Sequence, residues 1–321
     1  MIPFRKNVAI AIDGGGIRGV IATKALMLLE DHLGKSCHEI FRLAAGTSTG
    51  ALVAAGIAAG RPIKELHENY LSIGTEIFRK TFLSPLWWFE NHRYSNDALK
   101  EALHKAYGNL TMGDLWKADP PTDLVITVFD LIRNKACFVK PWKEREEDPD
   151  SNYADWSVAK TVLASCATPS FFPPIEGRYV DGGVGAYNNP CFLAAYEIQH
   201  YLSQMDSCNL AQTWDPKNNW NPAETTLISL GTGLEMPIIK DPEEASHLRA
   251  WEWIEPVLGA FQHSAILLQV RLVKTFFKEI DFRRFQVRLT EVIKMDDASK
   301  LDRLEEYGEL LWERMLNDQW E

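Results

Sequence analysis

The stretch Asp13-Gly14-Gly15-Gly16-Ile17-Arg18-Gly19 follows a short apolar run at residues 8–12. An apolar run that ends in a glycine turn indicates a buried strand, and helically spaced apolar residues up to about residue 33 indicate a helix behind it. The glycines would present backbone N–H groups at the start of that helix, where they can stabilise an anion. The sequence therefore predicts an anion-binding turn between a strand and a helix.

A second glycine-flanked turn, Gly46-Thr47-Ser48-Thr49-Gly50, follows another strand candidate at residues 40–45 and precedes a small-residue helix at 50–59. Glycines at this spacing allow the sharp bend of a nucleophile elbow, which lifts the serine hydroxyl above a sheet. A turn that only packs a helix against a strand could have the same glycine spacing. The apolar strand before it and the small-residue helix after it favour the elbow. Two strand–turn–helix units in succession predict a parallel sheet covered by helices.

The first glycine turn lacks the residues that two kinds of nucleotide-binding site require. It matches Gly-x-Gly-x-x-Gly, but a dinucleotide site needs an acidic residue at the end of the second strand. Here that strand leads into the turn around Ser48, and the nearest acids, Glu30 and Asp31, fall within the intervening helix. A phosphate loop of the Walker type fails because this glycine turn does not end in Gly-Lys-Ser/Thr. An oxyanion site is the interpretation that remains.

A serine nucleophile needs a base, which is a histidine in many hydrolases. None of the eight histidines occupies a glycine-rich strand end, so they are interpreted as surface or packing residues. Asp181-Gly182-Gly183 does occupy such a place, after a short strand at residues 179–180, although an aspartate can also simply stabilise a turn. The histidines are His32, His38, His67, His92, His104, His200, His247 and His263.

The rest of the chain shows a mixture of helical and strand-like segments. Residues 61–115 are expected to be mainly helical, 124–129 and 226–230 to be strands, and everything beyond Pro242 to be helical. Leu301, Leu304, Leu311 and Met315 form an apolar stripe on the last of these helices. Further helices are expected at 157–164 and 190–202, and surface loops at 141–155 and 208–224.

The bulk composition excludes several classes of protein. A formal net charge of −10 over 321 residues argues against a nucleic-acid polymer as ligand, although a local basic patch could still meet a lipid surface. No apolar run is long enough to span a bilayer, and the first residues do not resemble a signal peptide, so a cytoplasmic protein is expected. The five scattered cysteines indicate reduced packing residues rather than a metal site.

Taken together, these motifs resemble the patatin-like phospholipase family of lipid acyl hydrolases. The two glycine turns, Asp181-Gly182-Gly183 and the following Asn188-Asn189-Pro190 match in order, supported by residues 164–174 and 229–233. The resemblance covers about residues 7–235. It implies a single domain, residues 1–321, with a three-layer α/β/α fold, a mainly parallel central sheet and a helical C-terminal addition over about 242–321.

The resemblance also implies a mechanism that uses a Ser–Asp dyad and neither a metal nor an organic cofactor. Ser48 would be the nucleophile and Asp181 its base, and the N–H groups of Gly15, Gly16 and either Ile17 or Arg18 would form the oxyanion hole. The expected reaction is hydrolysis of phospholipid ester bonds through an acyl-serine intermediate. Because an ordinary aspartate is a weak base at neutral pH, we expect burial to raise the pKa of Asp181.

Several further roles follow from the same resemblance, each with an alternative. Arg18 could bind a lipid phosphate or form a surface salt bridge, and Trp87, Trp88 and Phe89 could form a lid or be buried. The serine could serve an acyltransferase instead. Activity could also await a signal such as a cyclic nucleotide, as in bacterial relatives that defend against phage. Transient contact with a membrane surface, and a homo-oligomer formed through the segment after Pro242, are further expectations.

Overall fold

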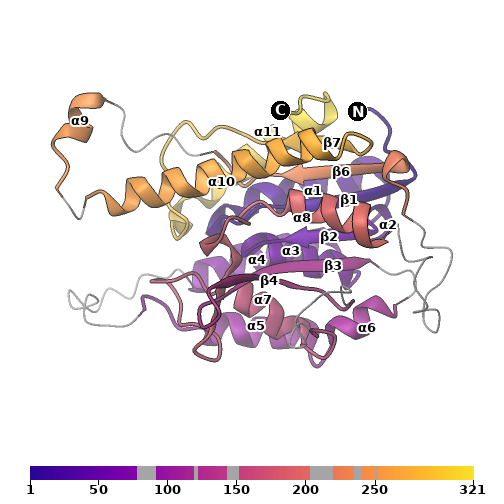
Figure 1. The fold of residues 1–321 in the computed structure, drawn as a ribbon, viewed down its shortest axis with the longest axis horizontal. Coiled ribbons are helices and arrows are strands. Elements are labelled where there is room, and N and C mark those ends of the chain that lie inside the picture. The colour runs from indigo at the N-terminus through magenta and orange to yellow at the C-terminus, as the bar shows by residue number, and fades with distance from the viewer. Residues whose placement is uncertain (78–91, 119–121, 143–151, 203–219, 235–240, 250–251) are drawn as a thin grey trace.

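A computed structural model describes the chain except for residues 78–91, 119–121, 143–151, 203–219, 235–240 and 250–251. In the described part, helices cover both faces of a central sheet of seven strands (Figure 1). The strand order is β4-β3-β2-β1-β6-β7, with β5 also paired to β3. The strands are β1 (Asn7–Ile12), β2 (Leu43–Gly46), β3 (Asp123–Asp130), β4 (Lys135–Val139), β5 (Tyr179–Asp181), β6 (Thr225–Leu230) and β7 (Asp281–Phe285).

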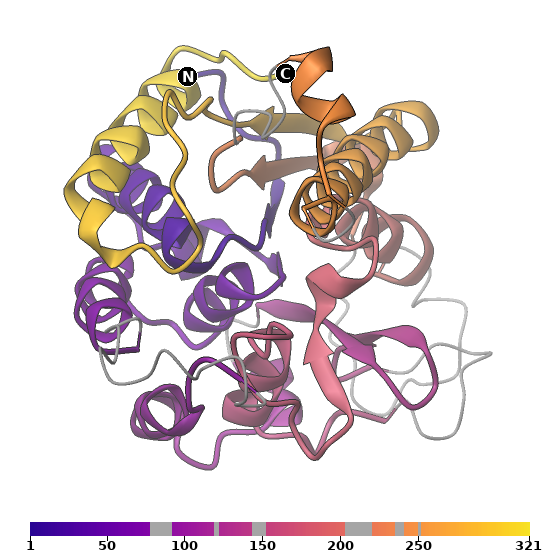
Figure 2. The same cartoon turned by 90° about the vertical axis from the view of Figure 1, so that its left-hand side faces the viewer.

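The pairing of the strands gathers the sequence motifs at one edge of the sheet. β1, β2, β3, β6 and β7 run parallel, so their carboxyl ends meet at the same edge, which faces the viewer in Figure 2. The register places Ile12 beside Gly46, the residues from which the two glycine turns depart. β5 is antiparallel to β3 and brings Asp181 opposite Val128. Three segments far apart in sequence therefore meet where the chemistry is expected.

Alternate side chains of the strands point to opposite faces of the sheet, and each face packs against one layer of helices. On β1, Val8, Ile10 and Ile12 pack against one layer of helices, whereas Ala9 and Ala11 pack against the other. The first layer contains α1 (Gly19–Leu33), α3 (Thr49–Ala58), α4 (Ile63–Ile77), α5 (Asp97–Tyr107), α7 (Val158–Ser165) and α11 (Leu301–Leu316), and the second contains α8 (Cys191–Tyr196) and α10 (Ile254–Phe276). Shorter helices are α2 (Cys37–Ile40), α6 (Met112–Trp116) and α9 (Pro242–Ser246).

The expected three-layer fold with a mainly parallel sheet is confirmed, and two strands are added to it. The prediction that the chain is helical from Pro242 to its end is wrong at β7, which extends the sheet beside β6. β4, which the sequence did not reveal, forms a hairpin with β3. The helix predicted over 190–202 continues beyond α8 as a π-helix at Glu197–Leu202. The stripe on α11 is confirmed, since Leu304, Leu311 and Met315 are buried.

Two other expectations concern residues of particular chemistry. Cys37, Cys137, Cys166 and Cys191 are free and buried, as the packing interpretation requires. Cys208 and the aromatic residues Trp87, Trp88 and Phe89 lie outside the described residues. Among the helices that the structure describes, we find none with the length and apolar character needed to cross a bilayer.

Candidate active site

Ser48 occupies a strained turn between β2 and α3. Its backbone has φ 54° and ψ −121°, which is uncommon for a residue with a side chain and costs about 1–3 kcal/mol. The turn needs glycine on both sides. A Cβ at Gly46 would lie 2.2 Å from the carbonyl oxygen of Gly50, and one at Gly50 would lie 2.1 Å from that of Ile12. These contacts explain the spacing Gly-x-Ser-x-Gly physically and fit a nucleophile elbow.

The elbow is tied to β3 through Ser165 at the end of α7. The backbone N–H of Ser48 donates to Ser165 Oγ at 2.8 Å, and that hydroxyl donates to the carbonyl oxygen of Thr127 at 2.8 Å. Thr47 Oγ1 lies 2.7 Å from Thr127 Oγ1 and also donates to the carbonyl oxygen of Tyr187. Because these bonds are buried, they hold the strained turn in place against relaxation.

Asp181 lies next to Ser48, where β5 ends. Gly183 N–H donates to its Oδ1 at 2.8 Å and Thr168 Oγ1 donates to its Oδ2 at 2.7 Å. Adjacent residues of one turn contact both, since Cys166 Sγ donates to the Ser48 carbonyl oxygen at 3.2 Å and the Asp181 N–H donates to that of Ala167 at 3.1 Å. The Ser48 side chain is also close enough to this carboxylate to lower its pKa. The serine and the aspartate singled out from the sequence therefore lie beside each other in the fold, although 133 positions separate them in the chain.

The environment of Asp181 changes its acidity. The side chain is 5% exposed, and this burial raises its pKa above the ordinary aspartate value, because a carboxylate is poorly solvated there. The hydrogen bonds from Thr168 and the Gly183 amide, together with the nearby Ser48 side chain, oppose that rise without cancelling it. The direction agrees with the expectation that the base is stronger than a solvent-exposed aspartate.

The glycine turn after β1 presents fewer free amides than the sequence indicated. Ile17 N–H donates to the carbonyl oxygen of Met295 at 2.8 Å, and Arg18 N–H donates to that of Gly15 at 3.2 Å. Both amides are thus already used, which corrects the prediction that one of them contributes to the oxyanion hole. Gly15 and Gly16 are the candidate donors that remain.

The conformation of this turn explains why it consists of glycines. Gly16 has φ +59°, and a Cβ there would lie 2.3 Å from the carbonyl oxygen of Met295. A Cβ at Gly15 would lie 2.3 Å from Thr232 Oγ1. Tyr70 OH on α4 donates to the carbonyl oxygen of Gly16 and holds the turn from the other side.

A buried ion pair that the sequence did not reveal anchors the start of this turn. Arg284 on β7 donates to Asp13 Oδ1 at 2.8 Å and to Asp13 Oδ2 at 2.6 Å, and both side chains are 1% exposed. Arg284 Nη1 also donates to Ser229 Oγ at 2.9 Å. Burial raises the pKa of Asp13, and the guanidinium opposes that rise. The C-terminal addition therefore contributes a contact at the edge of the site.

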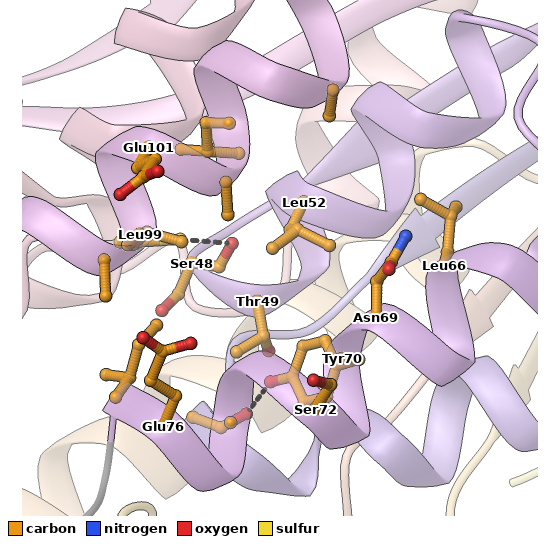
Figure 3. A pocket seen from close by; sticks show the side chains of 18 of the residues that line it. Ser48, Thr49, Leu52, Leu66, Asn69, Tyr70, Ser72, Glu76, Leu99 and Glu101 are labelled. Carbon is orange, nitrogen blue, oxygen red and sulfur yellow. Dashed lines mark hydrogen bonds between the residues drawn. The ribbon is translucent and has the colours of Figure 1, made fainter.

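A cavity of about 640 Å³ opens beside Ser48 (Figure 3). Its lining comes from the elbow, the glycine turn, α4, α5 and the turn at residues 166–172, with Met295 from the C-terminal addition. The lining contains apolar and charged side chains. The apolar ones are Leu52, Leu66, Ile77, Leu99, Leu103, Phe171 and Phe172, and the charged ones are Arg61, Glu65, Glu76, Glu101 and Lys105. Among the described residues that line it there is no histidine.

Arg18 and His67 are two buried basic residues near the site. Arg18 is 7% exposed, and its Nε donates to the carbonyl oxygen of Gly15. His67 is also buried, and contacts Thr23 Oγ1 at 2.8 Å and Glu305 Oε1 at 3.0 Å. It links α1, α4 and α11 as a packing residue.

Comparison with known proteins shows the family of the chain. The model of the family "Patatin-like phospholipase" matches residues 10–195, and the chain belongs to this family. "Intracellular phospholipase A2" of Caenorhabditis elegans is 26% identical over 91% of the chain, and "Patatin-17" of Solanum cardiophyllum is 25% identical over 96% of the chain and 84% of its own length. "cGAMP-activated phospholipase" of Pseudomonas aeruginosa is 28% identical over 60% of the chain and 57% of its own length. The chain spans 26% of the length of the worm relative.

Proposed function

We propose that the protein hydrolyses the carboxylic ester bonds of phospholipids through an acyl-serine intermediate, with Ser48 as nucleophile and Asp181 as general base. The observation that carries this proposal is the position of the buried Asp181 carboxylate next to Ser48, which occupies a strained elbow at the wall of a cavity. Membership of the patatin-like phospholipase family supports the substrate class.

The proposed reaction has two halves that use the same two side chains. As Ser48 Oγ attacks the ester carbonyl carbon, its proton passes to Asp181, which then gives it to the departing lysophospholipid oxygen. Water next attacks the acyl-serine and loses a proton to Asp181. That proton returns to Ser48 Oγ when the fatty acid leaves, so the enzyme is restored.

The negative charge that develops on the carbonyl oxygen would be stabilised by the backbone N–H groups of Gly15 and Gly16. Their turn is fixed by contacts to Met295, Thr232 and Tyr70, so little reorganisation is needed during the reaction. Arg18, at the end of the same turn, remains our candidate for steering a lipid phosphate.

The cavity fits one acyl chain of a lipid. Its volume of about 640 Å³ falls in the range of small-molecule sites, and both Ser48 and a set of apolar side chains line it. An acyl chain lying along these apolar side chains would place its ester carbon at the hydroxyl.

Release of free fatty acid from phosphatidylcholine in buffer tests this function directly. We expect release without any thiol acceptor, because water takes the acyl group. An acyltransferase that used Ser48 would instead need the acceptor thiol for turnover. Release that depends on the thiol would contradict hydrolysis as the function.

Control by a nucleotide is a second hypothesis, motivated by the similarity to the cGAMP-activated relative. The same assay, repeated with a panel of cyclic dinucleotides, measures it. Stimulation by one of them supports a gated enzyme, whereas full activity that no nucleotide changes excludes gating. Light scattering in both conditions tests whether an oligomer accompanies activation.

We further propose that α10 contacts the lipid surface from which the substrate is taken. Its buried face, which includes Ala265 and Val273, continues toward the helix start as Leu258 and Phe261, which are 58% and 50% exposed. This part of α10 extends beyond the sheet on the side where the parallel strands end (Figure 1). A stable dimer buries ~800 Å² of surface on each partner, and a few half-exposed side chains provide a much smaller area. This favours a lipid surface over a second copy.

Leu258→Asp combined with Phe261→Asp should weaken binding to phosphatidylcholine vesicles at least about tenfold, because two anchoring apolar contacts become charged. Hydrolysis of a soluble short-chain ester should stay unchanged, and Leu310→Asp, an exposed leucine on α11, is the matched control. Vesicle flotation measures the binding. Unchanged flotation refutes the surface, and loss of a dimer in light scattering would assign it to a second copy.

A further inference from the structure

Thr168 is placed between the proposed base and the wall of the cavity. It follows α7 by three residues, and its hydroxyl donates to Asp181 Oδ2 at 2.7 Å. The backbone at this point is also bonded to β5, since Asp181 N–H donates to the carbonyl oxygen of Ala167 at 3.1 Å. Thr168 itself lines the cavity beside Ser48. Main chain and side chain thus fix the two residues relative to each other.

Each of the two oxygens of the Asp181 carboxylate accepts a hydrogen bond from a different donor. The Gly183 amide bonds to Oδ1 and Thr168 bonds to Oδ2, so rotation of the carboxylate about its last bond would break both. The amide belongs to the main chain of the turn that follows β5. Thr168 provides the side-chain bond, and its β-branched side chain has few rotamers with which to turn away.

We propose that Thr168 is a positioning residue for the reaction, whose hydroxyl holds the Asp181 carboxylate ionised and turned toward Ser48. This inference rests on the proposed function, because it assumes that Asp181 takes the serine proton. It gives a role to a side chain that does not itself react and to which the sequence assigned no function.

The proposal predicts a pH effect of definite sign. Burial raises the pKa of Asp181 and the Thr168 hydrogen bond lowers it, so removing the hydroxyl raises that pKa further. The base is active when ionised, and the rate therefore rises with pH through this pKa. Without the hydroxyl, the rise occurs at higher pH.

The test is the pH profile of kcat/KM on a soluble ester for Thr168→Val and Thr168→Ser. In Thr168→Val, kcat/KM should fall about tenfold on the acid side of the profile and less than about threefold on the alkaline plateau. The tenfold loss corresponds to one charge-assisted hydrogen bond. Thr168→Ser, which keeps the hydroxyl, should follow the native profile. Thr161→Val is the matched control, because the buried Thr161 hydroxyl bonds to Ser157 and not to Asp181.

Other outcomes overturn the proposal without ambiguity. A Thr168→Val profile that falls by the same factor at every pH assigns the residue a structural role only. Should Thr168→Val fail to fold, Thr168→Ala is measured in its place. If kcat/KM of that variant rises at the same pH as in the native enzyme, the proposal is overturned as well. If Asp181→Asn leaves the native rate unchanged, the proposed function fails instead, and that result is separate from any effect at Thr168.

Discussion

Ser48→Ala is expected to lower kcat/KM for a soluble ester by about 10⁴-fold, and Asp181→Asn by about 10³–10⁴-fold. Alanine removes the only atom that can carry the acyl group. Asparagine keeps the shape of the base and its bond from the Gly183 amide, but cannot accept the proton. Initial rates at saturating and limiting ester concentration separate kcat from KM, and the loss should fall mainly on kcat.

A double variant distinguishes a dyad from two independent contributions. Residues that act as a unit are not additive, so Ser48→Ala with Asp181→Asn should be no worse than Ser48→Ala alone. Thr161→Val serves as the control for general damage near the site, since its side chain is buried at α7. Multiplicative losses in the double variant argue that Asp181 acts elsewhere.

Arg284→Met is expected to produce the largest loss of stability, about 3–5 kcal/mol in the free energy of unfolding. The substitution leaves the Asp13 carboxylate buried at 1% exposure without its bidentate partner. Asp13 directly precedes the glycine turn, so activity should fall as well. Urea unfolding followed by circular dichroism measures the loss.

The matched control replaces both partners. Asp13→Leu with Arg284→Met exchanges the buried pair for apolar side chains of similar size, and should recover most of the stability. A single variant that loses less than about 1 kcal/mol would show that the pair is not a structural anchor. A double variant no more stable than Arg284→Met would show that the cost is one of packing and not of an uncompensated charge.

The sequence sufficed where local backbone geometry dictates residue type. The glycines around Ser48 and at residues 14–16 occupy positions where a Cβ would collide with main chain or a neighbouring side chain, so the pattern carries the geometry. Asp181 could be singled out because it ends a strand and is followed by two glycines. Few other residues would fit at these positions, so the residue type predicts the backbone geometry there.

The sequence failed where long-range partners decide the outcome. Asp281–Phe285 carries two arginines and an aspartate among two phenylalanines and does not look like a buried strand. It becomes one because Arg284 is neutralised by Asp13, more than 270 residues earlier. The amides of Ile17 and Arg18 could not be excluded from the oxyanion hole either, since Met295 and Gly15 reach them only in the folded chain.

The position of the covalent bond formed with a fluorophosphonate tests the central claim most directly. Mass spectrometry of the digested protein should find one phosphonyl adduct, on the peptide that contains Ser48. The adduct should be absent in Ser48→Ala and should form at least about 100-fold more slowly in Asp181→Asn. Equal labelling of native protein and Ser48→Ala, with the adduct on another residue, would contradict the account.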